Sequence, residues 1–384
     1  MDHHPFKFGK LAEGVHFVDR EWERKRLKGN VLTGVNTILI SPRRYGKSSL
    51  VQQTAEDVST DKRIRFAQVD LFEVRDEREM LERITAAVIV ATSNTLEERL
   101  RDLKRFVQAI VPKVSLGSDP TQEMSIGLSW EDLQRSRHEL LDLPERLAQA
   151  KKIQLVLCID EFQNIGQFPD PKATQKLLRS AWQRHKHVTH VLYGSKRHMM
   201  LDIFTKSTMP FYKFGDLMFL ERIERPYWTA YIVDRFKRTK KKIDKDLATS
   251  IAAIMEDHPY SVQLLANAAW QQTKLTCTTA DIDNGLEELL DQYAILFQHL
   301  VDGLTTPQLR YLEALADGVE RFSTGEVLTR YELGSSAMVG RIRTALEKKD
   351  ILDHQGPKTV WLDPLFQHWL ERRFWRKPKR GITS

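Results

Sequence analysis

The sequence has little cysteine and no long apolar run. Cysteine occurs twice among 384 residues, at Cys158 and Cys277, which is too few for the disulfide framework of a small secreted domain. The longest apolar stretches, such as AAVIVA at 86–91, are far shorter than the roughly 20 residues that span a bilayer. The N-terminal residues lack the pattern of a signal peptide. We therefore expect a cytoplasmic protein without a membrane partner.

Internal repeats and low-complexity segments are also absent, so domain boundaries must come from changes in pattern. A chain of 384 residues has room for two or three domains. Its formal net charge of +7, from 59 basic and 52 acidic residues, modestly favours an anionic partner. The basic residues are densest at 235–242 and 372–380, and each cluster is either a solvated surface or an anion-binding one.

Five short, nearly continuous apolar segments alternate with helical patterns. They lie at 36–40, 65–71, 153–159, 189–195 and 217–223. Such segments are typical of strands buried on both faces, and their alternation with helices predicts an α/β fold with a parallel sheet covered on both sides. A polar and apolar alternation around GSDP, at about 113–130, predicts a β-hairpin inserted before the third strand.

The strand pattern stops after residue 224, so we expect the α/β core at 1–224 and a helical bundle at 225–302. Residues 303–374 then show a helix, a short helix, a third helix and a hairpin around Gln355 and Gly356. This order is typical of a winged helix. A basic tail, 375–384, follows it.

The segment SPRRYGKSS at 41–49 lies between the first predicted strand and a predicted helix. It has the spacing of a phosphate-binding loop, with Ser41 in place of the first glycine. Backbone N–H groups and the helix N-terminus bind phosphate in such loops. We expect Lys47 at the β- and γ-phosphates of ATP and the Ser48 hydroxyl at Mg²⁺. The loop residues expected to bind the nucleotide are Pro42, Arg43, Arg44, Tyr45, Gly46, Lys47, Ser48 and Ser49. A merely basic loop before a helix is the alternative.

A second motif, LVLCIDEFQ, places Asp160 and Glu161 at the end of a buried strand. Adjacent like charges there are hard to explain structurally, because they repel each other. We expect Asp160 to hold Mg²⁺ through water and Glu161 to act as the general base on the attacking water. With Lys47 they form the predicted catalytic group.

A third strand ends in Gly194 and Ser195. Ser195 is predicted to sense the γ-phosphate by hydrogen bonding, with Lys196 or Arg197 nearby, and is counted with the catalytic residues. An ordinary turn at the end of a strand is the alternative.

These motifs resemble those of the archaeal and bacterial ATPases allied to the STAND and origin-recognition branches of the AAA+ superclass. The segment FVDRE, Phe17 to Glu21, is similar to the family's Phe-Val-Gly-Arg-Glu box, and SPRRYGKSS, IDEFQ and LYGS match its three later motifs. DHPYSVQLLA, at 257–266, is similar to its Gly-His-Pro-Tyr lid signature. The likeness covers 15–270.

The resemblance implies an ATP-binding core with a helical lid. In that case Phe17 and Val18, together with His258 and Pro259 of the lid, flank the adenine, and Arg20 belongs to the nucleotide-binding residues. A helix start with Pro259 in its first position is a second interpretation of the lid signature, and both can hold.

The sequence departs from the family at Asp19, Ser41 and Asp257, where the family has glycine. Related sequences also have Gly-Arg where this chain has Gly215 and Asp216. The role of that arginine is then vacant, or it has moved to Arg222 or Arg197. Because an arginine finger supplies about 10³ to 10⁵ in rate, we predict slow intrinsic hydrolysis.

We therefore predict an ATP-driven switch in which nucleotide closes the lid and re-aims the winged helix toward DNA or a protein partner. In the third helix of that region, Val339, Ile342 and Leu346 face inward. The candidate DNA contacts are Arg341, Arg343, Lys348, Arg376 and Lys377. A winged helix that serves only as a structural or protein-contact module is the other interpretation of this region.

An assembly scaffold that binds nucleotide structurally, with little hydrolysis, is the alternative function. Glu161 argues against it, since a mere binder has no need of a water-activating carboxylate. A small-molecule kinase fits poorly, because no arginine-rich acceptor lid is present. ATP-dependent oligomerisation stays open.

Overall fold

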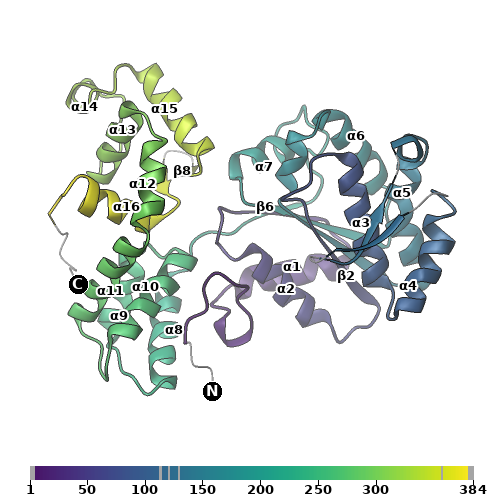
Figure 1. Ribbon diagram of the computed structural model, residues 1–384, viewed down its shortest axis with the longest axis horizontal. Coiled ribbons are helices and arrows are strands. Elements are labelled where there is room, and N and C mark those ends of the chain that lie inside the picture. The colour runs from purple at the N-terminus through teal and green to yellow at the C-terminus, as the bar shows by residue number, and fades with distance from the viewer. Residues whose placement is uncertain (1–4, 112–114, 120–121, 129, 356–357, 379–384) are drawn as a thin grey trace. The chain divides into compact units, whose positions relative to one another are not determined.

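The structure of the protein is a computed structural model that describes residues 5–111, 115–119, 122–128, 130–355 and 358–378 (Figure 1). The chain forms two compact units. Arg20–Glu221 make one, the sheet unit, and Met1–Asp19 together with Arg222–Ser384 make the other, the helical unit. The first 19 residues thus group with the helical unit, whereas the sequence analysis counted them with the α/β core. The physical reason is that Phe6 and Val18 pack against the hydrophobic core of the helical unit.

The sheet unit is built on five parallel strands in the order β2-β5-β6-β1-β7. Their bounds are Thr37–Ile40 (β1), Ile64–Asp70 (β2), Gln154–Asp160 (β5), Val188–Gly194 (β6) and Asp216–Phe219 (β7). The predicted α/β fold with a parallel sheet is therefore confirmed. The last strand is shorter than predicted, because it ends at Phe219 and not at residue 223.

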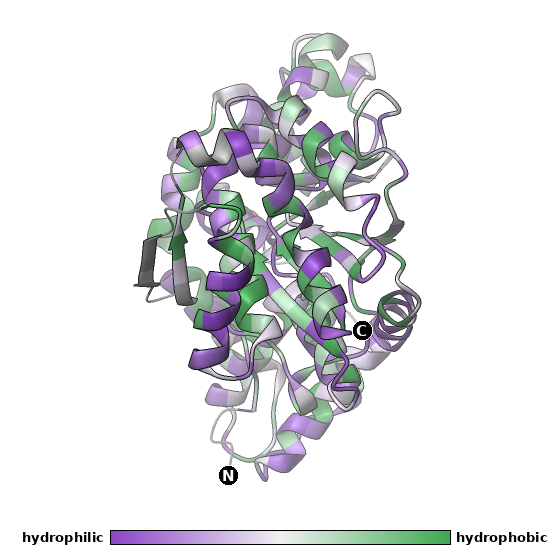
Figure 2. Cartoon of the chain, turned by 90° about the vertical axis from the view of Figure 1, so that its right-hand side faces the viewer, coloured by the Kyte–Doolittle hydropathy of each residue, from purple (hydrophilic) through white to green (hydrophobic). Residues whose placement is uncertain are grey.

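Helices cover both faces of this sheet, with α1 and α2 on one side and α3, α6 and α7 on the other (Figure 1). Their bounds are Glu21–Thr33 (α1), Lys47–Val58 (α2), Glu77–Thr92 (α3), Pro171–Trp182 (α6) and Arg197–Phe204 (α7). Hydrophilic and hydrophobic residues alternate around the helices of this unit (Figure 2). The apolar side chains of α3, α6 and α7 pack with those of the strands in one core, as Ile38, Met80 and Leu178 do.

A two-stranded antiparallel hairpin interrupts the alternation, as the sequence predicted. It consists of β3, Ser115–Asp119, and β4, Gln122–Gly127, and Pro120 of the predicted turn lies outside the described residues. Ile126 joins the core of the sheet unit. Before the hairpin, α4, Leu96–Asp102, runs into a π-helical turn, Leu103–Val107, which the sequence analysis did not predict. The helix α5, Trp130–Lys151, follows the hairpin.

The helical unit begins with a short 3₁₀ turn, Gly14–His16, and continues after Glu221 with five helices. These are Arg225–Arg238 (α8), Lys245–Ile254 (α9), Pro259–Gln272 (α10), Thr279–Gln292 (α11) and Ala294–Asp302 (α12). We call α8 to α12 the helical bundle. None of the described helices is long and apolar enough to cross a membrane.

The remaining elements, which we call the C-terminal subdomain, follow the order expected from the sequence. They are Thr306–Ala316 (α13), Gly325–Arg330 (α14), Ser336–Lys348 (α15), then the antiparallel strands Leu352–Gln355 (β8) and Lys358–Trp361 (β9). Gly356 of the predicted turn lies outside the described residues. A last helix, Pro364–Trp369 (α16), and a π-helical turn, Leu370–Phe374, were not predicted.

The helical bundle and the C-terminal subdomain share one continuous hydrophobic core. The ring of Phe297 in α12 lies 5.3 Å from that of Phe366 and 5.9 Å from that of Trp369, both in α16. Buried aromatic pairs of this kind stabilise a contact beyond their buried area. The two parts therefore form a single packed body.

Candidate functional site

The segment Ser41–Gly46 connects the end of β1 to the start of α2. Gly46 is the N-cap of α2 and has φ of +89°, and Arg44 also lies in the left-handed region at +68°. Because the N-cap is glycine, no N-cap side chain bonds to the first turn of α2. Such a turn is an anion-binding site by its dipole and its N–H groups. Any Cβ at position 46 would be strained by the backbone conformation, which is why glycine is needed there.

The ammonium group of Lys47 is folded back onto the same loop. Its Nζ donates to the carbonyl oxygens of Ser41 at 3.1 Å and Pro42 at 2.9 Å, and lies 3.4 Å from the Ser41 hydroxyl. Burial lowers the pKa of Lys47 to about 8, although the carboxylates of Asp160 and Glu161 favour its charged form. A negatively charged group near the loop would stabilise the charged form of Lys47 further, and a triphosphate is such a group.

Two residues predicted to hold Mg²⁺ lie in direct contact. Ser48 Oγ donates to Asp160 Oδ2 at 2.8 Å, and the other carboxylate oxygen of Asp160 accepts from the Glu161 N–H at 2.7 Å. Burial raises the pKa of Asp160 to about 6, with the nearby charge of Glu161 acting in the same direction. A hydroxyl beside a carboxylate is a donor set that suits Mg²⁺, which prefers oxygen ligands.

Glu161 adopts a left-handed conformation, with φ of +51°. Its Oε2 accepts from Ser195 Oγ at 2.9 Å and from the side-chain amide of Gln163. The predicted γ-phosphate sensor and the predicted base are therefore hydrogen-bonded to each other. The register explains why they meet, because Ile40 of β1 pairs with Gly194 and Ile159 of β5 pairs with Leu192.

The sequence analysis missed Gln163, which is fully buried. A Cβ at Gly194 would lie 1.9 Å from Gln163 Oε1, so glycine at position 194 makes room for this amide. The only sequence signal was a polar residue two positions after Glu161, next to Asn164.

Arg20 connects the loop to the residue that follows the sheet. It is only 5% exposed, and its guanidinium donates to the Glu23 carboxylate at 2.8 Å, to the carbonyl of Glu221 and, at 3.5 Å, to the carbonyl of Tyr45. These contacts link Arg20 to the backbone of the loop, and its predicted contact with nucleotide stays a prediction.

The other loop residues divide into two groups. Arg43 and Arg44 are exposed, whereas the side chains of Tyr45 and Ser49 are buried in the fold. Pro42 is buried as well and offers its carbonyl to Lys47. Arg43 is therefore placed to meet a bound anion, while Tyr45 and Ser49 support the loop through packing.

Comparison with known proteins agrees with this geometry. No protein-family model and no curated protein matches the chain. Among solved structures it is similar to the Walker-type ATPase of Pyrococcus abyssi, with a TM-score of 0.67 and 15% identity over 95% of this chain and 99% of that one. It is also similar to the ORC2 protein of Aeropyrum pernix in its ADPNP–ADP complexes, with a TM-score of 0.57 and 16% identity over 95% of this chain and 96% of that one.

The chain has the fold of an origin-recognition-like P-loop ATPase. In this P-loop ATPase fold, β1 carries the loop, and β5 and β6 end beside it. The residues predicted to serve the phosphates and Mg²⁺, Lys47, Ser48, Asp160, Glu161 and Ser195, all lie at this edge of the sheet.

The residues that the resemblance places around adenine lie in the helical unit of the P-loop ATPase fold. Val18 packs against the core of that unit. His258 is the N-cap of α10, and its Nδ1 accepts from the Ser261 N–H at 3.2 Å, while Pro259 takes the first helical position. The helix-start interpretation of this segment is therefore present in the structure, and the adenine contact of Phe17, Val18, His258 and Pro259 stays a prediction.

The position at which related sequences have arginine holds Asp216, at the start of β7. Its carboxylate pairs with Arg26 and accepts from Asn30, and it lies opposite Thr37, the first residue of β1. Strands rise by about 3.3 Å per residue, so this place is on the order of 10 Å from the phosphate-loop end of β1. A side chain at 216 belongs to the opposite edge of the sheet.

The two arginines considered as replacements differ in their surroundings. Arg197 lies over the ring of Phe219 at 5.0 Å and within 3.7 Å of the Glu221 carboxylate. Phe219 pairs with Ile40 at the end of β1 that leads into the loop, so Arg197 is on the same side of the sheet as Asp160 and Glu161. Arg222 is hydrogen-bonded within the helical unit to Glu256 and to the carbonyl of Trp361.

Proposed function

We propose that the protein is a slow, Mg²⁺-dependent ATPase that acts as a nucleotide-controlled switch. The observation that carries the proposal is one cluster at the end of three parallel strands. Lys47 lies in the first turn of α2, where its ammonium group donates to the Pro42 carbonyl. Ser48 contacts Asp160, and Glu161 contacts Ser195. These are the groups that phosphoryl transfer needs for charge neutralisation, metal binding and water activation. Similarity in fold to a protein with bound ADPNP and ADP supports an adenine nucleotide as the ligand.

In this proposal ATP replaces the loop carbonyls as the partner of Lys47. Mg²⁺ would be held by Ser48 and, through water, by Asp160, and would neutralise charge on the phosphate oxygens. Arg43 contributes positive charge at the mouth of the loop. The triphosphate would thus give the buried ammonium of Lys47, which donates to neutral loop carbonyls, a charged partner.

Slow turnover follows from the state of Glu161. A general base must accept a proton from water, yet one oxygen of Glu161 already accepts from both Ser195 and Gln163. A water molecule would have to compete with these two donors for the same carboxylate oxygen, which opposes its activation. The Asp216 position also supplies no arginine to the loop edge, and Arg197 is the candidate for that role.

In this proposal the C-terminal subdomain is a winged helix, and it is the part of the switch that binds the partner. Val339, Ile342 and Leu346 of α15 are buried, while Arg341 and Lys348 are exposed on its outer side. Arg343 is half-buried beside them. An exposed basic stripe on the third helix of such a domain suits the phosphate backbone of DNA. We therefore favour DNA over a protein partner.

The basic tail contributes less to this proposal than its composition indicates. Lys377 pairs with Asp317 at 2.6 Å and lies 3.7 Å from Glu313. Arg376 is exposed and stays a candidate contact. Residues 379–384 lie outside the described residues.

The test measures phosphate release by the wild-type protein, Lys47→Ala and Glu161→Gln, each with and without duplex DNA. We expect wild-type turnover well below ~1 s⁻¹, the low end of the usual range for enzymes, and nucleotide binding without turnover in Glu161→Gln. Lys47→Ala should lose nucleotide binding. Equal turnover in wild type and Glu161→Gln would instead support the scaffold alternative, in which nucleotide is only structural. The particle mass with Mg·ATP, measured in parallel, reports whether the protein assembles.

A further inference from the structure

The turn between α9 and α10 contains two adjacent strained residues. Glu256 and Asp257 have φ of +49° and +59°, in the left-handed region that favours glycine. The Asp257 N–H donates to the Ala252 carbonyl at 2.8 Å and the Glu256 N–H donates to the Ala253 carbonyl at 3.0 Å. This is the Schellman pattern that ends a helix, with Glu256 at the position where glycine is usual. Such conformations persist only where neighbouring groups hold them.

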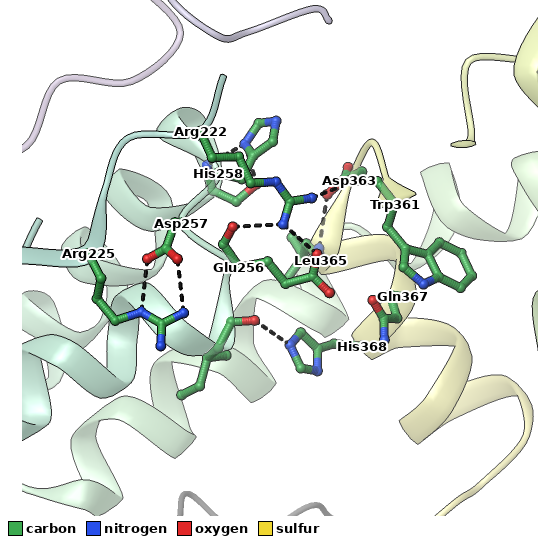
Figure 3. Close-up of polar contacts among 12 residues, drawn as sticks. Arg222, Arg225, Glu256, Asp257, His258, Trp361, Asp363, Leu365, Gln367 and His368 are labelled. Atoms are coloured by element: carbon green, nitrogen blue, oxygen red, sulfur yellow. Dashed lines mark hydrogen bonds and ion pairs between the residues drawn. The ribbon is translucent and has the colours of Figure 1, made fainter. Parts of the chain in front are cut away.

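Three side chains from the segment that leaves the sheet unit hold this turn, and Figure 3 shows two of them, Arg222 and Arg225. Arg222 Nη1 donates to the Glu256 carbonyl at 2.8 Å and to its carboxylate at 2.6 Å. Arg225 forms a two-pronged ion pair with Asp257, at 3.0 and 2.9 Å. Trp228 Nε1 donates to the Asp257 carbonyl at 3.3 Å. The turn precedes His258, so these contacts also fix where α10 begins.

The same turn is tied to the C-terminal subdomain. Arg222 Nη2 donates to the Trp361 carbonyl at the end of β9, at 3.0 Å. His368 Nε2 lies 2.8 Å from the Ile254 carbonyl at the end of α9, and burial lowers the pKa of this histidine. Figure 3 shows the Arg222 guanidinium between Glu256 and the chain segment that carries Trp361. One guanidinium thus joins the α9–α10 turn to the end of the hairpin.

Arg222 is also the residue directly after Glu221, whose carbonyl is held by Arg20. Arg20 reaches the Tyr45 carbonyl within the phosphate loop. A short series of contacts therefore leads from the loop to Glu221 and, across one peptide bond, to Arg222. A contiguous series is not by itself coupling, since coupling requires that both ends bias the same element.

We propose that Arg222 is a positioning residue that couples the phosphate loop to the C-terminal subdomain by clamping the strained Glu256–Asp257 turn to the Trp361 carbonyl. The inference rests on the proposed nucleotide site. It names the element through which nucleotide acts: Arg222 contacts both the strained turn and the Trp361 carbonyl, so displacement of Glu221 and Arg222 breaks this link between the turn and the end of the hairpin. Arg225 holds the turn as well, but no contact of Arg225 with the C-terminal subdomain occurs among the described residues.

The experiment follows amide hydrogen exchange in residues 358–369 of the full chain, with and without a non-hydrolysable ATP analogue and Mg²⁺. In the wild-type protein we expect the analogue to change exchange at least threefold. In Arg222→Gln this change should disappear, while affinity for the analogue stays within threefold of wild type. Arg225→Gln is the matched control, because it loosens the turn but should keep the nucleotide-dependent change. Persistence of that change in Arg222→Gln overturns the proposal.

A second arm needs no nucleotide. Arg20→Gln should raise exchange in 358–369 at least threefold, but only while Arg222 is present, so the double variant with Arg222→Gln should show no further increase. Equal increases in both backgrounds overturn the coupling. If the wild-type protein binds no nucleotide, the proposed function fails and this arm still decides the inference. If it binds nucleotide without any change in 358–369, the inference fails and the nucleotide site stands.

A conservative variant guards against a folding defect in Arg222→Gln. Arg222→Lys keeps the charge, but one ammonium group cannot serve Glu256 and the Trp361 carbonyl together as a planar guanidinium does. We expect it to melt as the wild type does and to lose the nucleotide-dependent change. A variant that melts normally and keeps the change contradicts the role of the guanidinium fork.

Discussion

Charged groups are treated differently in the two units. At the carboxyl edge of the sheet unit, burial moves two pKa values toward neutrality, that of Lys47 down to about 8 and that of Asp160 up to about 6. In the helical unit, two basic residues near the C-terminus are instead matched with carboxylates. Arg373 pairs with Glu287 and Asp291, and Lys377 pairs with Asp317.

This difference between the two units indicates where a charged ligand would stabilise the protein. Buried charges raise the free energy of the unliganded protein because burial removes them from water. A ligand of the opposite charge lowers that free energy. Charges that are already paired gain little from a new partner. The basic clusters in the sequence are therefore a poor guide to the anion-binding surface, whereas the perturbed pKa values point to the phosphate loop.

The largest effect should come from the lysine of the loop. Lys47→Met removes two or more charge-assisted hydrogen bonds to phosphate, each worth about 1.5 kcal/mol, so we expect affinity for Mg·ATP to fall about 100-fold. Lys151→Met is the matched control, because Lys151 donates to the Thr92 carbonyl and to Glu98 away from the site. Isothermal titration calorimetry of both variants measures their affinity for Mg·ATP. An equal loss of affinity in the two variants would contradict a special role for Lys47.

A pH effect should follow from Asp160. Its folded pKa lies near 6, above the usual 3.8, so Asp160 is protonated below pH 6 and cannot serve Mg²⁺. We expect affinity for Mg·ATP to fall up to tenfold per pH unit as the pH drops below 6. Stability of the free protein should move the opposite way, because between pH 3.8 and 6 the folded state binds more protons than the unfolded state.

Titrations and thermal melts between pH 5 and 8 measure both trends. Asp160→Asn should flatten the stability change in that window. If affinity is constant across it, Asp160 does not act on the metal.

A rate increase of about tenfold is expected from Gln163→Leu. The variant frees Glu161 from one of its two side-chain donors, and a hydrogen bond to a charged group is worth ~1.5 kcal/mol. Gln175 is a buried glutamine in α6 of the same unit, so Gln175→Leu serves as the control and should leave phosphate release unchanged. Slower release in Gln163→Leu would show that the amide assists Glu161.

The smallest effects should separate the basic residues of the helical unit. Arg341→Ala and Lys348→Ala should each lower the slope of log affinity for duplex DNA against log salt by about 1. Arg373→Ala should leave that slope unchanged and cost at most about 1 kcal/mol of stability, because its ion pairs are partly exposed. Fluorescence anisotropy at several salt concentrations gives the slopes. Identical slopes in all three variants would favour a protein partner.

Much of the fold was predictable because its signals are local. Apolar runs, the Gly46-Lys47-Ser48 sequence and the acidic pair after a buried strand each specify their element within a few residues. Parallel strands then bring the ends of β1, β5 and β6 to one edge without further information. The buried face of α15, formed by Val339, Ile342 and Leu346, was likewise predicted from their helical spacing.

What the sequence could not supply are contacts between distant residues. Nothing near Arg373 indicates Glu287, and nothing near Arg222 indicates that Glu256 and Trp361 lie beside it. Gln163 looked like any polar residue after a strand, and only the room made by Gly194 identifies its place. The strained turn at Glu256 and Asp257 was visible solely as a departure from glycine at position 257.

The packing of Phe297 against Phe366 and Trp369 has an evolutionary consequence. A gene exchange with its crossover at residue 302 would part α12 from α16 and leave aromatic rings on each product facing water. Recombination that replaces the C-terminal part must therefore carry α12 with it or rebuild both sides together. The C-terminal subdomain should therefore be inherited together with the helical bundle. New binding specificities should arise by substitution on the outer face of α15 more readily than by exchange of the whole subdomain.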